Sequence, residues 1–242
     1  MVKSDKLTLG LEALEGLEHF NQWILDEIRP HFGSRLAEVG GGIGTFAGFL
    51  VTDYLLRNIS SSLEVFEPTA HLYTKMHHKL ARHYPSLIES GRLVLTQGFF
   101  EPSEKKYDTV ILINVLEHIE DDLALLRTAH ETLYQGGTLI IFVPALTRLY
   151  SSFDKAVGHH RRYERPALEQ LFLKAGFEVV KSQYMDLLGV LPWYFLNVLC
   201  GSQSLNPGLA HLYDKAFVPM TRWIEGIYPP IAGKNLLVVG QK

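Results

Sequence analysis

The sequence is poor in cysteine and has no excess of basic charge. Its single cysteine, Cys200, cannot form an internal disulfide, so we expect a reducing compartment. Lys and Arg number 23 against 26 Asp and Glu, and the net charge of −3 predicts no nucleic-acid partner. The longest apolar run, Leu187–Cys200, is shorter than the roughly 20 residues of a membrane-spanning helix, and Pro192 interrupts it. Since no secretory signal is recognisable either, we expect a cytoplasmic protein without stable membrane insertion.

What the sequence does contain is an alternation of short apolar runs with helical patterns. TVILIN (109–114) and TLIIFV (138–143) are apolar almost throughout, which predicts strands buried on both faces of a parallel sheet. The predicted strands are Arg35–Val39, Leu63–Glu67, Arg92–Thr96, Thr109–Asn114, Thr138–Val143, Phe177–Gln183 and Leu236–Gly240. The predicted helices are Leu11–Ile28, Thr45–Arg57, Thr69–His83, Asp121–Tyr134 and Pro166–Ala175. This order predicts a doubly wound α/β sheet in one domain over residues 1–242.

Two segments stand outside this alternation. Residues 1–30 predict an N-terminal helix, stopped by Pro30, that either covers the sheet or closes over a ligand. Residues 185–233 are aromatic and Leu-rich without a convincing strand, and they predict an apolar elaboration before the last strand. This elaboration could cap a ligand pocket, enlarge the core or face a second subunit in a homodimer. Among the helix ends, Asp121 is expected to cap a helix that QGG (135–137) terminates.

A glycine-rich stretch follows the first predicted strand. EVGGGIG places Glu38 just before Gly40, Gly41, Gly42 and Gly44. Glycines between a strand and a helix let the backbone approach a ligand closely, and ligands of open parallel sheets bind beyond the carboxyl ends of the strands. The stretch therefore predicts a site for a nucleotide-like ligand.

Two ligands compete for this site. GIGTFA (42–47) satisfies G-x-G-x-x-A, which favours a dinucleotide whose pyrophosphate meets the helix N-terminus. The carboxylate of Glu38 instead favours S-adenosylmethionine, which carries an ammonium and a sulfonium but no phosphate. Glu67 ends the second predicted strand and could accept both hydroxyls of a ribose in either ligand, or be a surface acid.

Four blocks carry a family resemblance. EVGGGIG, VFEP, YDTVILINVLEHIEDD and LYQGGTLIIFVPA follow one another at the spacing of the class I S-adenosylmethionine-dependent methyltransferases, which the chain resembles over nearly its whole length. The resemblance implies a Rossmann-like sheet of seven strands with the last strand antiparallel, and S-adenosylmethionine as the cofactor. The implied cofactor-binding residues are Glu38, Gly40, Gly41, Gly42, Gly44, Glu67, Pro68, Gln97, Gly98, Phe99, Asn114, Val115, Leu116 and His118.

Within this set the resemblance assigns Glu67 to the ribose and Gln97, Gly98 and Phe99 to the adenine. Many relatives have an aspartate where Gln97 stands, although a glutamine oxygen can still accept one hydrogen bond from an exocyclic amine. The stretch YSSFDKAVGHHRRYERPALEQLFLKAGFEVV (150–180) further resembles a bacterial subgroup of the type 11, 12 and 23 methyltransferases with a G-H-x-R-R-Y motif. That subgroup modifies sugars, lipids or secondary metabolites, which implies a small-molecule acceptor.

Candidate catalytic residues follow the fourth and fifth predicted strands. Methyl transfer needs an aligned nucleophile and, for a hydroxyl or protonated amine, a base that is most often histidine. We predict His159, on a long loop, as the acceptor-facing base, with His118 and Tyr163 as further candidates. His118 could instead pack beside the donor.

The neighbouring Arg161 and Arg162 could steer an anionic acceptor, or they could pair with Asp154, Glu164 or helix ends and fix the loop.

Four more histidines, namely His71, His77, His78 and His83, fall on one predicted helix. Because no cysteines or clustered carboxylates complete a closed site there, we expect a solvated helical face and no metal. The sequence as a whole predicts an S-adenosylmethionine-dependent methyltransferase acting on a natural-product, sugar or lipid-like acceptor. Two alternatives stay open: an NAD(P)-dependent oxidoreductase, and a non-catalytic S-adenosylmethionine-binding partner protein.

Overall fold

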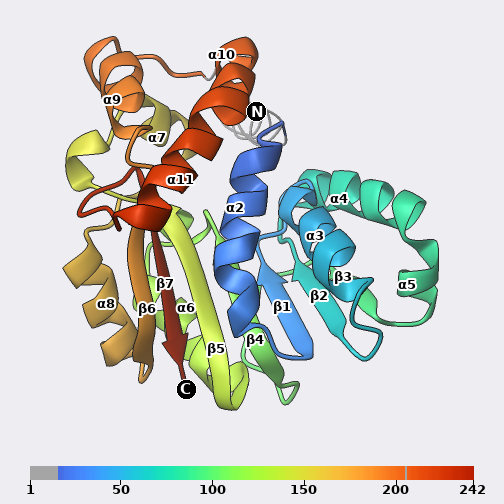
Figure 1. Ribbon diagram of the computed structural model, residues 1–242. Coiled ribbons are helices and arrows are strands. Elements are labelled where there is room, and N and C mark those ends of the chain that lie inside the picture. The colour runs from blue at the N-terminus through green and yellow to red at the C-terminus, as the bar shows by residue number, and fades with distance from the viewer. Residues whose placement is uncertain (1–15, 205) are drawn as a thin grey trace.

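The computed structural model describes residues 16–204 and 206–242 and contains one sheet of seven strands in the order β3-β2-β1-β4-β5-β7-β6 (Figure 1). Strands β1 to β5 are parallel, and β7 runs antiparallel to both of its neighbours. The strands are β1 (Arg35–Val39), β2 (Ser62–Phe66), β3 (Leu93–Thr96), β4 (Tyr107–Ile113), β5 (Leu133–Pro144), β6 (Glu178–Met185) and β7 (Asn235–Gln241). The order reverses between β1 and β4, so a ligand crevice is expected beyond their carboxyl ends. The predicted seven-stranded sheet with an antiparallel last strand is confirmed.

Helices cover both faces of the sheet. They are α2 (Glu18–Ile28), α3 (Thr45–Leu50), α4 (Ala70–His83), α5 (Pro85–Glu89), α6 (Asp122–Thr132), α7 (Ser152–Val157), α8 (Arg165–Lys174), α9 (Val190–Trp193), α10 (Pro207–Leu212) and α11 (Val218–Ile227). Short 3-10 or π segments are η1 (Arg29–His31), η2 (Val51–Leu55), η3 (Leu116–His118), η4 (Thr147–Leu149), η5 (Tyr194–Leu199) and η6 (Tyr213–Phe217). In Figure 1, α2 and α3 lie in front of the sheet and α6 lies behind it.

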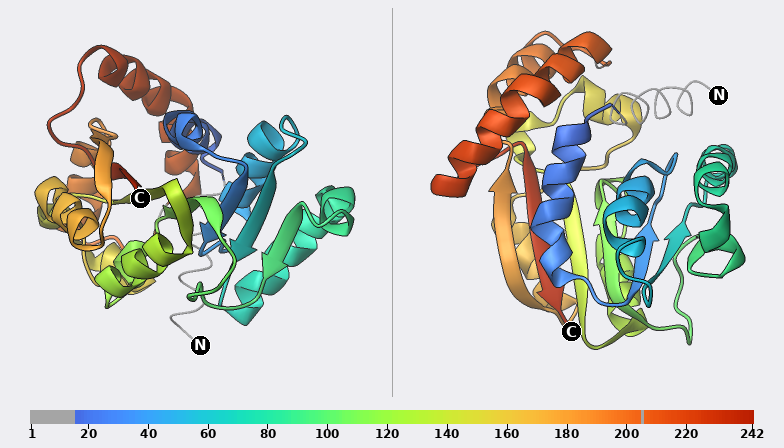
Figure 2. Two further views of the ribbon diagram at one scale, coloured as in Figure 1. Left: turned by 90° about the horizontal axis from the view of Figure 1, so that it is seen from below. Right: turned by 45° about the vertical axis from the view of Figure 1, so that its right-hand side comes forward.

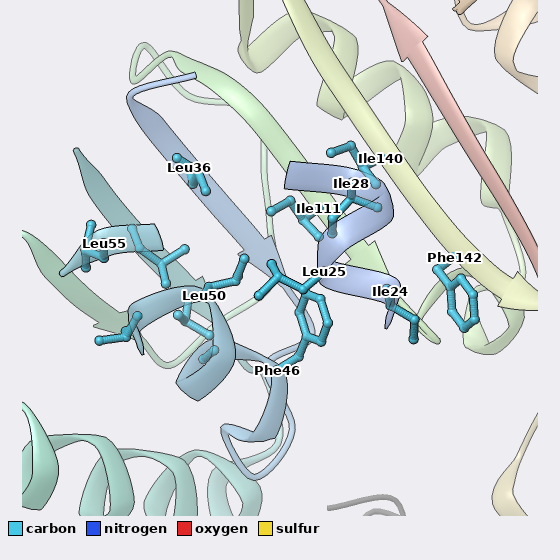
Figure 3. Packing of buried hydrophobic residues seen from close by; sticks show 14 of the residues in the cluster. Ile24, Leu25, Ile28, Leu36, Phe46, Leu50, Leu55, Ile111, Ile140 and Phe142 are labelled. Atoms are coloured by element: carbon cyan, nitrogen blue, oxygen red, sulfur yellow. The ribbon is translucent and has the colours of Figure 1, made fainter. Parts of the chain in front are cut away.

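Apolar side chains alternate between two cores, one on each face of the sheet. On the front face, Leu25 and Ile28 of α2 are fully buried beside Ile111 of β4 and Ile140 of β5 (Figure 3). On the back face, α6 and α8 pack on the intervening residues of the same strands. Each fully buried Leu or Ile contributes about 1.5–3 kcal/mol relative to exposure. The near-continuous apolar strands predicted from the sequence therefore serve both cores.

One predicted helix end was wrong. Asp121 does cap α6, since its Oδ1 accepts from the Ala124 N–H at 3.0 Å. However, α6 ends at Thr132, and QGG (135–137) lies within β5. A Cβ on Gly137 would lie 2.9 Å from the Tyr134 carbonyl oxygen and within 3.1 Å of another backbone oxygen. Gly137 is therefore required because two backbone oxygens, of Tyr134 and Asp108, lie where a side chain would be. It stands near the start of β5 and does not cap a helix.

The elaboration between β6 and β7 is helical in its described part. Its segments α9, η5, α10, η6 and α11 gather at the end of the sheet where the parallel strands have their carboxyl ends, beside the start of α2 (Figures 1 and 2). The sequence prediction of a segment without strands is confirmed for these residues. Many of its large apolar side chains stay exposed, among them Leu191, Trp223 and Ile231 at 74%, 69% and 95%. No helix in the described ranges combines the length and apolar character needed to cross a bilayer.

The buried carboxylate of Asp214 joins this elaboration to the N-terminal helix, beside the more exposed pair of Arg222 with Asp26. Leu17, at the start of α2, provides no side-chain cap. Instead Asp214 of η6 accepts the backbone N–H groups of His19 at 3.1 Å and Phe20 at 2.9 Å, and its side chain is buried. An aspartate in this place satisfies two free N–H groups and faces the positive end of the helix. The prediction of an N-terminal covering helix is tested only from residue 16, because residues 1–15 lie outside the described part.

We expect Asp214→Ala to lower the free energy of unfolding by about 1–3 kcal/mol, because it leaves two helix N–H groups without an acceptor. Asp214→Asn should cost less, since its amide oxygen can still accept one of the two. Asp53→Ala, which removes the i,i+4 pair with the exposed Arg57, serves as control and should cost about 0–0.5 kcal/mol. Urea unfolding followed by circular dichroism measures all three. An Asp214→Ala variant as stable as the control would show that this contact does not stabilise α2.

Candidate functional site

The glycine loop sits where three strands meet, at the carboxyl ends of β1, β2 and β4. Gly40 has φ of +76°, and a Cβ there would lie 2.5 Å from Cγ2 of Val115, just after β4. A Cβ on Gly41 would lie 2.3 Å from Cγ1 of Val65 in β2. Real Cβ atoms do not come this close, so Gly40 is required for both conformation and space, and Gly41 is required for space. The glycine run therefore lets the loop pass close to two neighbouring strands.

Hydrogen bonds tie this loop to the end of β2. The N–H groups of Gly40 and Gly41 both donate to the Phe66 carbonyl oxygen, at 2.8 and 2.9 Å. Glu67 is buried, and its two oxygens accept the N–H groups of Gly42 and Thr69, each at 2.8 Å. A carboxylate has about four acceptor sites, so Glu67 can hold the loop and still accept from a hydroxyl. Because Glu67 is buried, the alternative interpretation of this residue as a surface acid is wrong.

Glu38, the acid of the glycine motif, is buried, and one of its carboxylate oxygens has no hydrogen-bond donor among the described residues. Its side chain lies at the end of β1, and this oxygen is Oε2. Burial, followed by the nearby charge of Glu67, raises the pKa of Glu38 to about 8. The hydroxyl of Thr45, at the start of α3, is a second unpaired buried group beside the loop, and the sequence analysis missed it. Both groups would gain a partner from a polar or cationic ligand.

Pro68 and the residues assigned to an adenine lie close to Glu67 and the glycine loop, at the carboxyl edge of the sheet. Pro68 and Gln97 are exposed, and Phe99 is exposed to 71%, which is unusual for a phenylalanine. The Gly98 N–H donates to the Glu67 carbonyl oxygen at 3.2 Å, so this segment follows directly beside the ribose candidate. The structure thus brings the residues predicted after β2 and β3 to one edge.

The segment after β4 flanks the glycine loop on the side away from β2. Asn114 adopts a left-handed backbone with φ of +53°, which is uncommon outside glycine and is often found at binding sites. Its N–H donates to the Phe142 carbonyl oxygen at 2.8 Å, which fixes the bend. Val115 then contacts Gly40, and Leu116 is fully buried. The implied donor residues from β1, β2, β3 and β4 therefore share one edge of the sheet.

The long loop predicted after β5 contains η4 and α7, and its arginines are paired. Nε of Arg162 donates to Asp154 Oδ1 at 2.9 Å, and its guanidinium lies over the ring of Trp193 at 4.7 Å from the centroid. NH1 of Arg161 donates to Asp122 Oδ2 at 2.8 Å. The sequence left open whether the two arginines steer an acceptor or fix the loop. These contacts support arginines that fix the loop.

Tyr163 is also bound inward. Its hydroxyl lies 3.0 Å from Asp122 Oδ2 and 3.2 Å from the Leu116 carbonyl oxygen, and the side chain is buried. Burial and the charge of Asp122 raise the pKa of Tyr163 well above its ordinary value. This phenol therefore braces the segments after β4 and β5 against each other.

The two other catalytic candidates, His118 and His159, lie together with a residue that the sequence analysis missed. The rings of His118 and His159 are 4.7 Å apart between centroids and meet edge to face. Glu117 is fully buried beside them, with its Oε1 3.8 Å from Nε2 of His159. Burial raises the pKa of Glu117 to about 8, while burial and the charge of His159 lower the pKa of His118 to about 4. The motif LEH shows an acid next to His118, but nothing in it shows that the acid is buried.

Two further features lie away from this edge. A cleft of about 590 Å³ opens at the amino ends of the strands, between His31, Asp108 and Gly136. Ligands of open parallel sheets bind at the opposite edge, so we do not assign it to the donor. The four histidines of the predicted solvated face lie on the exposed side of α4.

Comparison with known proteins agrees with this geometry. Residues 16–182 match a family model described as a methyltransferase domain. A phosphoethanolamine N-methyltransferase 2 from Haemonchus contortus, solved with S-adenosylmethionine, is similar with a TM-score of 0.61 and 14% identity over 93% of this chain. The chain covers 52% of that protein, or about half its length.

Two other similar structures are matched over most of their length. A candidate sarcosine dimethylglycine methyltransferase from Galdieria sulphuraria has a TM-score of 0.61 and 17% identity, with 92% of this chain and 85% of that one covered. A methyltransferase from Archaeoglobus fulgidus has a TM-score of 0.56 and 14% identity, with 92% and 94% covered. No curated protein sequence matches the chain. At such identities the structures show the shared fold, whereas the family model covers more than half of the sequence, and on that ground the chain belongs to the methyltransferase domain family.

Proposed function

We propose that the protein transfers a methyl group from S-adenosylmethionine to a small organic acceptor. The observation that carries the choice of donor is the pair of buried acids, Glu38 and Glu67, on either side of the glycine loop. A pyrophosphate would meet the carboxylate of Glu67 and would oppose ionisation of Glu38, whereas an ammonium and a sulfonium would be attracted by Glu67 and would favour that ionisation. This argues against the dinucleotide alternative raised by GIGTFA.

For the acceptor, support comes from the segments after β4 and β5. Glu117 and His118 come after Val115 and Leu116, Val115 contacts the glycine loop, and His159 completes the cluster. We place the removal of a proton from the acceptor at this cluster, beside the methyl donor. The helical elaboration over residues 185–233 would close the acceptor side, and its apolar side chains favour a natural-product, sugar or lipid-like acceptor with an apolar part. A single domain, a cytoplasmic location and a homodimer stay predictions.

The donor assignment is tested by ligand-induced stabilisation. We expect S-adenosylhomocysteine to raise the melting temperature, and NAD(H) to leave it unchanged. Glu67→Gln should weaken S-adenosylhomocysteine binding at least tenfold, because it loses a charged acceptor. Glu64→Gln serves as control, because Glu64 lies within β2 and bonds to Thr96, Tyr107 and Lys105; the affinity of this variant for S-adenosylhomocysteine should stay within about twofold of the wild type.

Stabilisation by NAD(H) alone would overturn the choice of donor. Transfer of labelled methyl groups to a panel of acceptors then separates a methyltransferase from a non-catalytic binding protein. A labelled product establishes turnover, and it also identifies the acceptor class.

Donor binding should release a proton from Glu38. Its carboxyl has a pKa of about 8 and is mostly neutral at pH 7, whereas the ligand's ammonium favours the ionised form. Affinity for S-adenosylhomocysteine should therefore rise with pH between about 6 and 8, by up to about tenfold per unit. Glu38→Gln should lack this component, and the ligand's own amine titrates equally with both proteins. Calorimetry in buffers of different ionisation heat measures the proton directly, and equal pH slopes for the two proteins would contradict the prediction.

The cluster is tested with two adjacent histidines. We expect His159→Gln to lower kcat by about 10²–10⁴-fold with an acceptor found in the labelled screen, and to leave donor affinity unchanged. His160→Gln is the matched control, since the His160 side chain is exposed and its backbone N–H, which the substitution keeps, donates to the Glu117 carbonyl oxygen. If both variants kept full turnover, the place of His159 in the reaction would be wrong.

A further inference from the structure

Three side chains of types that can ligate a metal converge from two segments at the carboxyl edge of the sheet. Glu117 and His118 belong to η3, after β4, and His159 follows α7. One ligand atom from each lies within 4.8 Å of the other two. Oε1 of Glu117 and Nε2 of His159 are 3.8 Å apart, against roughly 3.4 Å expected for two ligands at about 2.0–2.1 Å from a tetrahedral ion. A movement of a few tenths of an ångström would therefore bring these two atoms to the separation expected of ligands on one ion.

Both imidazoles are already oriented by a second group. Nδ1 of His159 lies 2.9 Å from Asp154 Oδ1, so the ring donates from that side and keeps its Nε2 lone pair toward Glu117. The ring of His118 is hydrogen-bonded to the backbone of Gly158. Metal-binding histidines almost always donate their other N–H to a carboxylate or a backbone carbonyl, which fixes the ring and makes it a better ligand.

Asp154 is itself held firmly. Its Oδ2 accepts from the backbone N–H and the hydroxyl of Ser151, both at 2.8 Å, while its Oδ1 accepts from Arg162. The orientation of His159 is thus fixed by a fully bonded carboxylate, as a preorganised ligand requires.

Glu117 provides the second, independent observation. Its side chain is fully buried, and neither carboxylate oxygen has a hydrogen-bond partner in the described part of the chain. The nearest cation, Arg162, donates instead to Asp154 and to the Ala145 carbonyl oxygen. A buried carboxylate without a partner is costly unless it is paired or coordinates a metal. Its Oε1 faces the free nitrogen of His159, which is where an ion would lie.

We propose that Glu117, His118 and His159 bind one divalent transition-metal ion, of which Zn²⁺ is the representative. Two imidazoles and one carboxylate suit such ions, whereas Mg²⁺ and Ca²⁺ prefer oxygen ligands throughout. Three protein ligands leave at least one coordination position open, as in catalytic rather than structural sites. The site lies apart from the four histidines of α4, and the proposal departs from the expectation of no metal that the sequence analysis drew from those histidines.

The open position gives the ion a chemical role. A bound hydroxyl loses its proton more easily on such an ion, because the metal charge stabilises the alkoxide. This would prepare an oxygen acceptor for attack on the methyl group, with the proton passing to solvent, and His159 would then act as a ligand of the ion and not as the base itself. The role rests on the proposed methyl transfer, whereas the metal site itself does not.

Metal binding is tested without reference to activity. The untagged full chain is freed of metal with a chelator and titrated with Zn²⁺ by calorimetry and with Co²⁺ by visible absorption. We expect one equivalent to bind, with Co²⁺ bands typical of mixed nitrogen and oxygen ligands. Glu117→Gln and His159→Gln should each weaken binding at least tenfold, and His78→Gln, on the exposed face of α4, should leave it unchanged.

Glu117→Gln removes an unpaired buried charge and is expected to fold, which keeps the comparison meaningful. Binding of less than one equivalent by the wild type would overturn the proposal. Retention of tight binding by both site variants would do so as well. S-adenosylhomocysteine affinity, measured on the same samples, shows separately whether the donor site is intact.

Discussion

The contact between the glycine loop and the ends of β2 and β4 is the constraint on which the site depends. Gly40 and Gly41 both donate to the Phe66 carbonyl oxygen, while Val115 fills the space that a side chain on Gly40 would need. The loop is therefore clamped between two strands that flank β1. Any ligand bound across the first strands meets backbone from β1, β2 and β4 at fixed positions, which is the preorganisation that binding and alignment of a methyl donor require.

A second centre of organisation is Asp154. It completes a capping box at the start of α7, accepts from Arg162 and orients His159. Arg162 in turn stacks on Trp193 of α9, so the elaboration after β6 is joined to the segment that carries the histidine. At the opposite side of the elaboration, Asp214 caps α2. The segment that is least regular in sequence is thus attached by buried carboxylates both to the segment that carries His159 and to the front face of the fold.

The strands could be predicted because their pattern is local. Arg35–Val39 was predicted with the observed bounds, since an apolar run before a glycine turn is visible in the sequence itself. The glycines at 135–137 were misassigned because a helix-ending glycine and one needed for the close approach of backbone look alike in sequence. Asp214 and Glu117 could not be found, because capping across 195 positions and burial beside His159 are set by tertiary packing. Sequence therefore indicates which edge of the sheet is functional, but not which acids are buried there.

The distribution of unpaired charge at that edge is the remaining argument about function. Glu38 and Glu117 are both buried and both have an elevated pKa, and each retains a carboxylate oxygen without a partner in the described part of the chain. Burial of either side chain lowers the free energy of unfolding, because a buried carboxylate must be either neutralised or paired. Glu38 precedes Gly40 and Glu117 follows Val115 in the chain, these two neighbours pack against each other, and Glu117 lies beside two imidazoles. Two separate cations, an organic one at Glu38 and a metal ion at Glu117, would account for both carboxylates and would bring donor and acceptor to the neighbouring segments after β1 and β4.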